Sequence, residues 1–150
     1  MDDRFMRGFL SGLVAGIVMD AIDLTLYWLK IDTFRFLDYS AVISFEKIAS
    51  GPIEVIFALI IELVFKAGLG VLFVLIVPKL KSNYLIIKGA LFGVATWFVI
   101  YAIIVLTKAP KFPKLDVAGS FSQLANSLVY GIVLSMMLIW FKHRDDIEIK

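Results

Sequence analysis

The chain has 150 residues, of which 61% are apolar, with a mean hydropathy of +0.92 and a formal net charge of +2. This length gives room for one domain, and the apolar fraction exceeds the about 45–50% of soluble domains. The small, scattered net charge argues against a nucleic-acid partner. The lack of cysteine excludes disulfides, thiol nucleophiles and cysteine-based metal sites, and we expect no cofactor.

Four long apolar runs dominate the sequence, at 5–29, 53–77, 84–107 and 121–141. Each reaches the roughly 20 residues that a helix needs to cross the hydrocarbon core of a bilayer. A soluble helical bundle is the alternative, and it fails because runs of this length offer water no polar face. The sequence therefore predicts an all-α, four-helix integral membrane bundle that occupies 1–150 as a single domain.

The first run lies where a secretory signal peptide would also lie. Asp2 and Asp3 dilute the basic residues that open such a peptide, and the apolar run continues past Asp20 without an A-x-A-like cleavage site. We therefore expect this helix to remain as an anchor. More Lys and Arg residues fall on the side that carries both termini than on the opposite side. This bias predicts a bacterial cytoplasmic (inner) membrane protein with both termini in the cytoplasm.

The two outer connections, at 30–52 and 108–120, differ in character. In the first, 38–49 could form a short helix along the membrane surface, capped by Asp38 or Ser40. An irregular loop over the mouth of the bundle is the alternative. The second contains KAPKFPK, whose lysines would line one edge of a polyproline II segment because that helix has three residues per turn. This outer basic edge could meet lipid phosphates, an anionic partner or the acidic first loop, and it consists of Lys108, Lys111 and Lys114.

Each predicted span carries a stripe of small residues at intervals of four. Such stripes let helix backbones approach closely. Four of them exceed what one interior needs, so we expect the face formed by Gly8, Gly12 and Gly16 to join subunits of a closed homo-oligomer. The residues assigned to helix packing are Gly8, Gly12, Gly16, Gly70, Gly89, Gly93, Ser127, Gly131 and Ser135.

A basic-Gly-x-Leu-x-Gly pattern occurs at 7–12 and again at 88–93. Two tandem helical hairpins in parallel orientation would produce such a repeat. Chance is the alternative, because glycine is common in membrane helices.

Ionisable side chains within the apolar runs form the candidate functional site. Asp20 and Glu62 each lie about 13 Å from the outer end of their helices, at 1.5 Å per residue. An ionisable group at such depth costs about 2.5–3.5 kcal/mol on insertion scales, so it usually faces a partner or water. Lys66 lies one turn from Glu62, and Asp23 and Asn126 approach from the outer half of the membrane. Three carboxylates and one ammonium require a protonated carboxyl, a bound cation or access to water.

Three interpretations of this polar cluster stay open. An ionic clasp would have Lys66 neutralise Glu62 and Asp20 as a structural element. A proton- or cation-handling site would use the surplus carboxylates. Recognition of a polar helix in another membrane protein is the third. An enzyme acting on lipid head groups is less supported: Asp20-x-x-Asp23 lacks the longer motif of membrane phosphotransferases, and G-x-S-x-G, H-E-x-x-H and P-loop motifs are missing.

The opening segment, RGFLSGLVAGIVMDAIDL, resembles the first helix of uncharacterised small four-helix membrane proteins of bacteria, particularly Gram-positive ones. The resemblance covers about one helix, rests on a Gly/Ala-rich pattern and implies no reaction. We expect a non-enzymatic protein that self-associates or serves a larger membrane assembly, with the bilayer, itself or another membrane protein as partner. The alternative is a small transporter or channel that handles protons or cations through the polar cluster.

Overall fold

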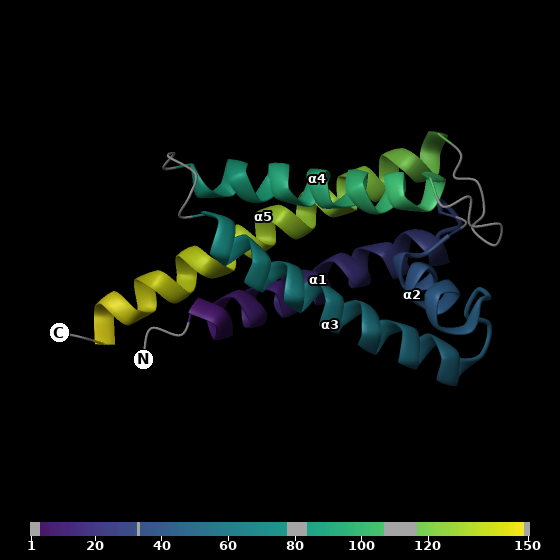
Figure 1. The fold of residues 1–150 in the computed structure, drawn as a ribbon, viewed down its shortest axis with the longest axis horizontal. Coiled ribbons are helices and arrows are strands. Elements are labelled where there is room, and N and C mark those ends of the chain that lie inside the picture. Colours follow the sequence, from purple (N-terminus) through teal and green to yellow (C-terminus); the bar gives the residue numbers. More distant parts are fainter. Residues whose placement is uncertain (1–3, 33, 78–83, 107–116, 149–150) are drawn as a thin grey trace.

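The structure is a computed structural model that describes residues 4–32, 34–77, 84–106 and 117–148. Regular structure in these residues is entirely α-helical, as the sequence predicts. The helices are α1 (Arg4–Trp28), α2 (Phe36–Phe45), α3 (Pro52–Ile76), α4 (Leu85–Leu106) and α5 (Val117–Glu148) (Figure 1).

Four helices of the described residues, α1, α3, α4 and α5, are long and apolar enough to cross a membrane. Three of them follow the predicted runs closely. The helix α5 extends beyond 121–141 at both ends, because the polar residues that flank an apolar run can still continue a helix. Residues 117–120 are therefore helical rather than part of the predicted 108–120 loop. The remaining part of that loop, with Lys108, Lys111 and Lys114, lies outside the described residues.

The four long helices form two pairs. The helix α1 packs along α3, α4 packs along α5, and contact between α1 and α5 joins the pairs. This is the pairing of two successive helical hairpins. The start of α1 and the end of α5 lie at one end of the molecule, and α2 lies at the other end (Figure 1). Where the pairs meet, Ala15, Met19, Phe73, Tyr130 and Leu134 form a buried apolar cluster.

Glycines bring α1 and α3 into backbone contact. A Cβ atom added to Gly8 would lie 2.8 Å from the carbonyl oxygen of Gly70, and one added to Gly12 would lie 2.6 Å from that of Lys66. The face that we expected to join subunits is therefore covered by α3 of the same chain. That expectation is wrong because the hairpin partner already occupies the stripe.

The pair α4–α5 is built in the same way. Added Cβ atoms would collide with backbone or side-chain atoms of the facing helix at every glycine of the α4–α5 stripes. Ser135 lies in this contact, where its hydroxyl donates a hydrogen bond to the carbonyl oxygen of Leu85 at 3.0 Å. The residues brought together here are Gly89, Gly93, Ser127, Gly131 and Ser135.

The short helix α2 is packed against α3 and contacts α1. It begins two residues before the predicted 38–49 segment, and it ends at Phe45, followed by Glu46 in a left-handed conformation with φ 56°. Asp38 is therefore a first-turn residue rather than the N-cap. Its carboxylate accepts a hydrogen bond from the Arg35 backbone N–H at 3.0 Å, so it still satisfies a backbone donor at the helix start.

Candidate functional site

Lys66 is the centre of the polar site. It lies on α3, its residue is only 5% exposed, and it forms ion pairs with Asp20 of α1 and Glu62 of α3. Glu62 is one helical turn away, and its Oε1 lies 2.6 Å from Lys66 Nζ, as the spacing of four predicts. Gly16 makes room for the lysine stem, because a Cβ there would lie 3.0 Å from Lys66 Cδ. This glycine therefore admits a side chain rather than a backbone.

The charges of this site do not balance. Asp20 and Glu62 are both buried, and they share the single ammonium of Lys66. Asp20 Oδ2 and Glu62 Oε2 have no hydrogen-bond partner among the described residues. A buried carboxylate oxygen without a partner is costly, so the site favours one additional positive charge or proton.

Asp23 and Asn126 form a separate group. Asp23 Oδ2 accepts a hydrogen bond from the Phe36 backbone N–H at 2.8 Å, and Asn126 Nδ2 donates to Asp23 Oδ1 at 3.5 Å. The sequence placed all five polar residues in one cluster. Their hydrogen bonds and ion pairs form two groups, with Asp20, Glu62 and Lys66 in an ionic site and Asp23 and Asn126 in an anchor for α2. Asp23 still lies close enough to interact electrostatically with Asp20 and Lys66.

A second network, which the sequence analysis missed, joins α2 to α4 and α5. The Tyr39 hydroxyl donates a hydrogen bond to Gln123 Oε1 at 2.8 Å, and Trp97 Nε1 donates to the same oxygen at 3.4 Å. Burial raises the pKa of the Tyr39 hydroxyl above its ordinary value, so this hydroxyl stays a proton donor. Only the polar position of Gln123 within an apolar run could have signalled this contact.

Arg35 is another residue that the sequence analysis did not single out. Its guanidinium donates to Asp38 Oδ1 at 2.8 Å and to the carbonyl oxygen of Ala49 at 2.8 Å. Burial alone would lower the pKa of Arg35, but the hydrogen bond and charge of Asp38 outweigh burial and raise it. The spacing of three between Arg35 and Asp38 was the available signal. This ion pair fixes the start of α2.

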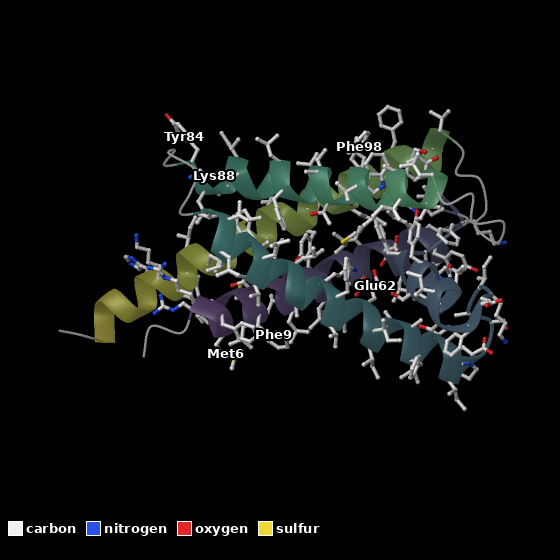
Figure 2. All side chains as sticks on the ribbon, viewed as in Figure 1. Met6, Phe9, Glu62, Tyr84, Lys88 and Phe98 are labelled. Carbon is white, nitrogen blue, oxygen red and sulfur yellow. The ribbon has the colours of Figure 1, made fainter. Side chains whose placement is uncertain are left out.

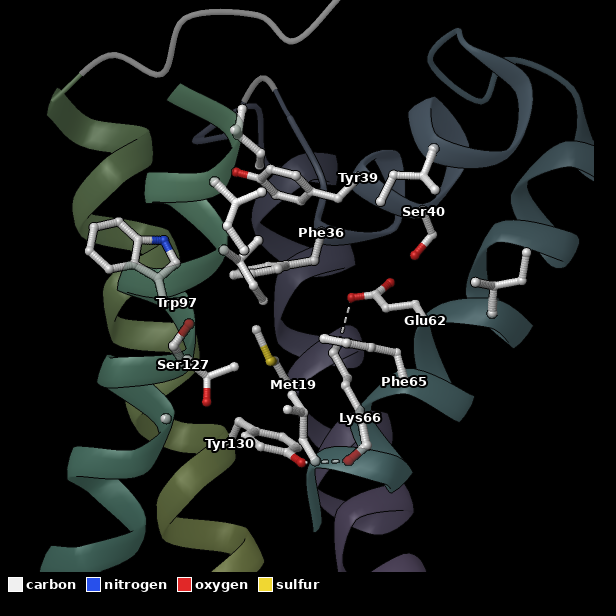
Figure 3. Close-up of a pocket in the computed structure, with 18 residues that line it drawn as sticks. Met19, Phe36, Tyr39, Ser40, Glu62, Phe65, Lys66, Trp97, Ser127 and Tyr130 are labelled. Atoms are coloured by element: carbon white, nitrogen blue, oxygen red, sulfur yellow. Dashed lines mark hydrogen bonds and ion pairs between the residues drawn. The ribbon is translucent and has the colours of Figure 1, made fainter. Parts of the chain in front are cut away.

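A cavity of about 420 Å³ lies between α3 and α4, with α2 at one end (Figure 3). Apart from the contact between the Phe73 and Phe92 rings, α3 and α4 make little contact with each other, because each uses its small-residue face for a different partner. Glu62 and Lys66 lie in the wall, and Figure 3 shows the Glu62 carboxylate pointing into the cavity. Most of the other lining residues are apolar or aromatic, including Phe36, Phe65 and Trp97.

The cavity reaches the lateral surface of the helix pairs. Two of its lining residues, Phe65 on α3 and Ile103 on α4, are 51% and 55% exposed. Phe65 lies midway along the apolar helix α3, whereas Ile103 lies in the last turn of α4, at the end of the molecule that carries α2 (Figure 1). Access beside Phe65 would lead through the hydrocarbon of a bilayer, and the cavity is also lined by Ile43 of α2, which is 80% exposed.

The charged groups of the ionic site meet at one ammonium. In the described part of the chain, no three Asp, Glu or His side chains converge as a metal ion requires. Asp20 and Glu62 both form ion pairs with the ammonium of Lys66. A buried carboxylate in such an arrangement can accept a proton or pair with a cation.

These features define the class as a small multi-pass helical protein, with four apolar helices that indicate a membrane and a buried ionic site between two helix pairs. The chain belongs to the DUF6789 family, a family of unknown function whose model matches residues 3–149. This is consistent with the expected resemblance to uncharacterised proteins, and it assigns no reaction. No curated protein and no solved structure matches the chain.

Proposed function

We propose that this protein is a small membrane transporter that handles protons or other cations at the site formed by Asp20, Glu62 and Lys66. The observation that carries the proposal is the cavity that reaches the Glu62 carboxylate. A purely structural ionic clasp would be closed and fully paired. Here the Glu62 carboxylate faces a cavity, and two carboxylate oxygens lack hydrogen-bond partners among the described residues. The proposed function is non-enzymatic.

The chemical argument rests on a surplus of one negative charge. Within the ionic site, two carboxylates and one ammonium leave at least one negative charge that a proton or a cation must balance inside the membrane, and the nearby buried Asp23 adds a third carboxyl group. Because either species can do this, the arrival of one favours release of the other. Such competition at a buried carboxylate is the basis on which proton-linked transport operates.

The test is ion flux into proteoliposomes. Wild type should pass protons or small cations above the background of empty vesicles, and Asp20→Asn and Glu62→Gln should return the flux to that background. Glu54→Gln is the matched control, because Glu54 lies on the same helix and pairs with Lys47 outside the site. Wild-type flux equal to that of empty vesicles for several cations would overturn the proposal.

The proposal includes a location in the bacterial cytoplasmic membrane, with both termini in the cytoplasm. Since the chain has no cysteine, single cysteines can report this orientation. A membrane-impermeant maleimide applied to intact spheroplasts should label Trp28→Cys and leave Arg4→Cys unlabelled. Both positions are exposed, at opposite ends of α1. The reverse pattern would refute the orientation.

Self-association, or service in a larger membrane assembly, is the second candidate. The observation that favours it is α4, which packs mainly on α5 and leaves large apolar side chains exposed along its other faces. Phe98 and Leu91 are examples (Figure 2 labels Phe98). The mass of the detergent-solubilised protein tests this candidate, and a monomer that shows cation flux would remove it.

A further inference from the structure

We infer that the cavity between α3 and α4 binds a hydrophobic organic cation, with a protonated amine on the Glu62 carboxylate and an apolar body against the helix walls. This inference rests on the proposed function, since it names the class of cation handled at the same site. The ligand that we infer has an apolar body, which a simple ion lacks, and a positive charge, which a lipid acyl chain lacks.

The charged half of the ligand follows from Glu62. This residue is 4% exposed, its carboxylate points into the cavity, and its Oε2 has no hydrogen-bond partner among the described residues (Figure 3). An N–H of an amine would provide the donor that is missing. It would also bring two positive charges to the two carboxylates, Asp20 and Glu62, of the ionic site.

The apolar half follows from the walls. Isoleucines of α4 form one side of the cavity, and aromatic rings of Phe36, Phe65 and Trp97 form much of the rest. Aromatic faces attract cations, and Lys66 Nζ already lies 5.6 Å from the centre of the Phe36 ring. The volume of about 420 Å³ falls in the range of about 300–1,000 Å³ that is typical of small-molecule sites.

Other ligand classes fit less well. An anion would meet the surplus negative charge, and Lys66 cannot balance it because both of its acidic neighbours already engage that ammonium. A phospholipid head group would have to bring its phosphate about 13 Å into the bilayer, at the depth of Glu62. A hydrophobic amine instead partitions into the hydrocarbon and can enter on the lateral side of the cavity beside Phe65.

The test uses Trp97 as a reporter in the cavity wall. The chain has three tryptophans, so Trp28→Phe with Trp140→Phe leaves Trp97 alone. This protein, in nanodiscs of zwitterionic lipid, is titrated with 1-adamantanamine and with the neutral isostere 1-adamantanol. The amine should change Trp97 fluorescence saturably and bind at least about tenfold more tightly than the alcohol, a difference of about 1.4 kcal/mol.

Two variants connect the preference to the site. Glu62→Gln should bind the amine and the alcohol with about equal affinity, whereas Glu54→Gln should keep the preference for the amine. Thr96→Phe fills the cavity from α4 and should weaken both ligands. Circular dichroism and a monodisperse elution profile establish that each variant is folded, and Glu62→Asp, which keeps the charge, should keep a preference for the amine.

Equal affinity for amine and alcohol in the wild type, or an undiminished preference in folded Glu62→Gln, would overturn the inference. The outcome is separate from that of the flux assay. Cation flux without amine binding would refute the ligand class and leave the transport proposal standing. Saturable amine binding in a protein that passes no ions would refute transport and leave the binding site standing.

Discussion

Removing the central ammonium should destabilise the protein more than removing every charge of the ionic site. In Lys66→Met, the methionine can follow the path of the lysine stem past Gly16, so the change is mainly one of charge. Asp20 and Glu62 then lose the group that they share. Breaking a buried ion pair from one side typically costs about 3–5 kcal/mol, because the remaining charge is uncompensated.

The free energy needed to protonate a carboxyl group sets an independent upper limit on this loss of stability. A carboxyl with an ordinary pKa near 4 can be held neutral at pH 7 for about 4 kcal/mol, at 1.36 kcal/mol per pH unit. Lys66→Met requires one more neutral carboxyl than the wild type, so we expect a loss of about 3–4 kcal/mol at pH 7. Protonation becomes easier as the pH falls, so at pH 5 the loss should shrink by about 3 kcal/mol. The other titratable groups nearby are common to both proteins, namely Asp23, Tyr39 and Tyr130.

The assay is reversible unfolding in mixed micelles, with the wild type measured beside each variant at pH 7 and pH 5. The triple variant Asp20→Asn, Glu62→Gln, Lys66→Met carries no charge at the site and should lie within about 2 kcal/mol of the wild type. Equal stability of Lys66→Met and the triple variant at pH 7 would refute the reasoning. A loss in Lys66→Met that is the same at both pH values would refute the protonation limit.

The remaining predictions concern the packing and the anchor of α2. Gly12→Leu should lower stability by at least about 1–3 kcal/mol, because the side chain would collide with α3, and it should leave the mass of the folded species in detergent unchanged. Asp23→Asn should weaken the charge-assisted bond to the Phe36 N–H and speed hydrogen exchange in α2 by about tenfold; an unchanged exchange rate would contradict the anchor. Tyr39→Phe should cost about 1 kcal/mol in the same unfolding assay through its lost bond to Gln123, and no measurable cost would argue against that contact.

The long helices could be predicted because the length of an apolar run is a property of the sequence alone. Their exact ends could not: α5 continues through polar residues after Phe141, where hydropathy falls but helix propensity does not. The start of α2 was also misplaced. The Arg35–Asp38 ion pair and the bond from Phe36 to Asp23 decide it, and the second of these joins residues 13 positions apart.

The ionic site could be predicted in part. A spacing of four pairs Glu62 with Lys66, and equal depth in antiparallel helices brings Asp20 to the same level. The cavity could not be predicted, because it depends on which helices fail to pack against each other. The same limit explains the error over Gly12, since small residues at intervals of four indicate close contact without indicating whether the partner is in the same chain.

The two glycine-lined pairs have a mechanical consequence. Backbone contact at the glycines makes each pair, α1 with α3 and α4 with α5, a rigid unit. The contact of α1 with α5 joins the two units along one side. Rotation of one unit by a few degrees about the α1–α5 contact would leave the glycine contacts intact. The displacement would be largest on the side away from the α1–α5 contact, where α3 faces α4 across Glu62. Such a rotation would change the width of the space beside the unbalanced charge, and the hydrogen bonds that cross between the pairs, from Tyr39 to Gln123 and from Tyr130 to the carbonyl oxygen of Lys66, would oppose it.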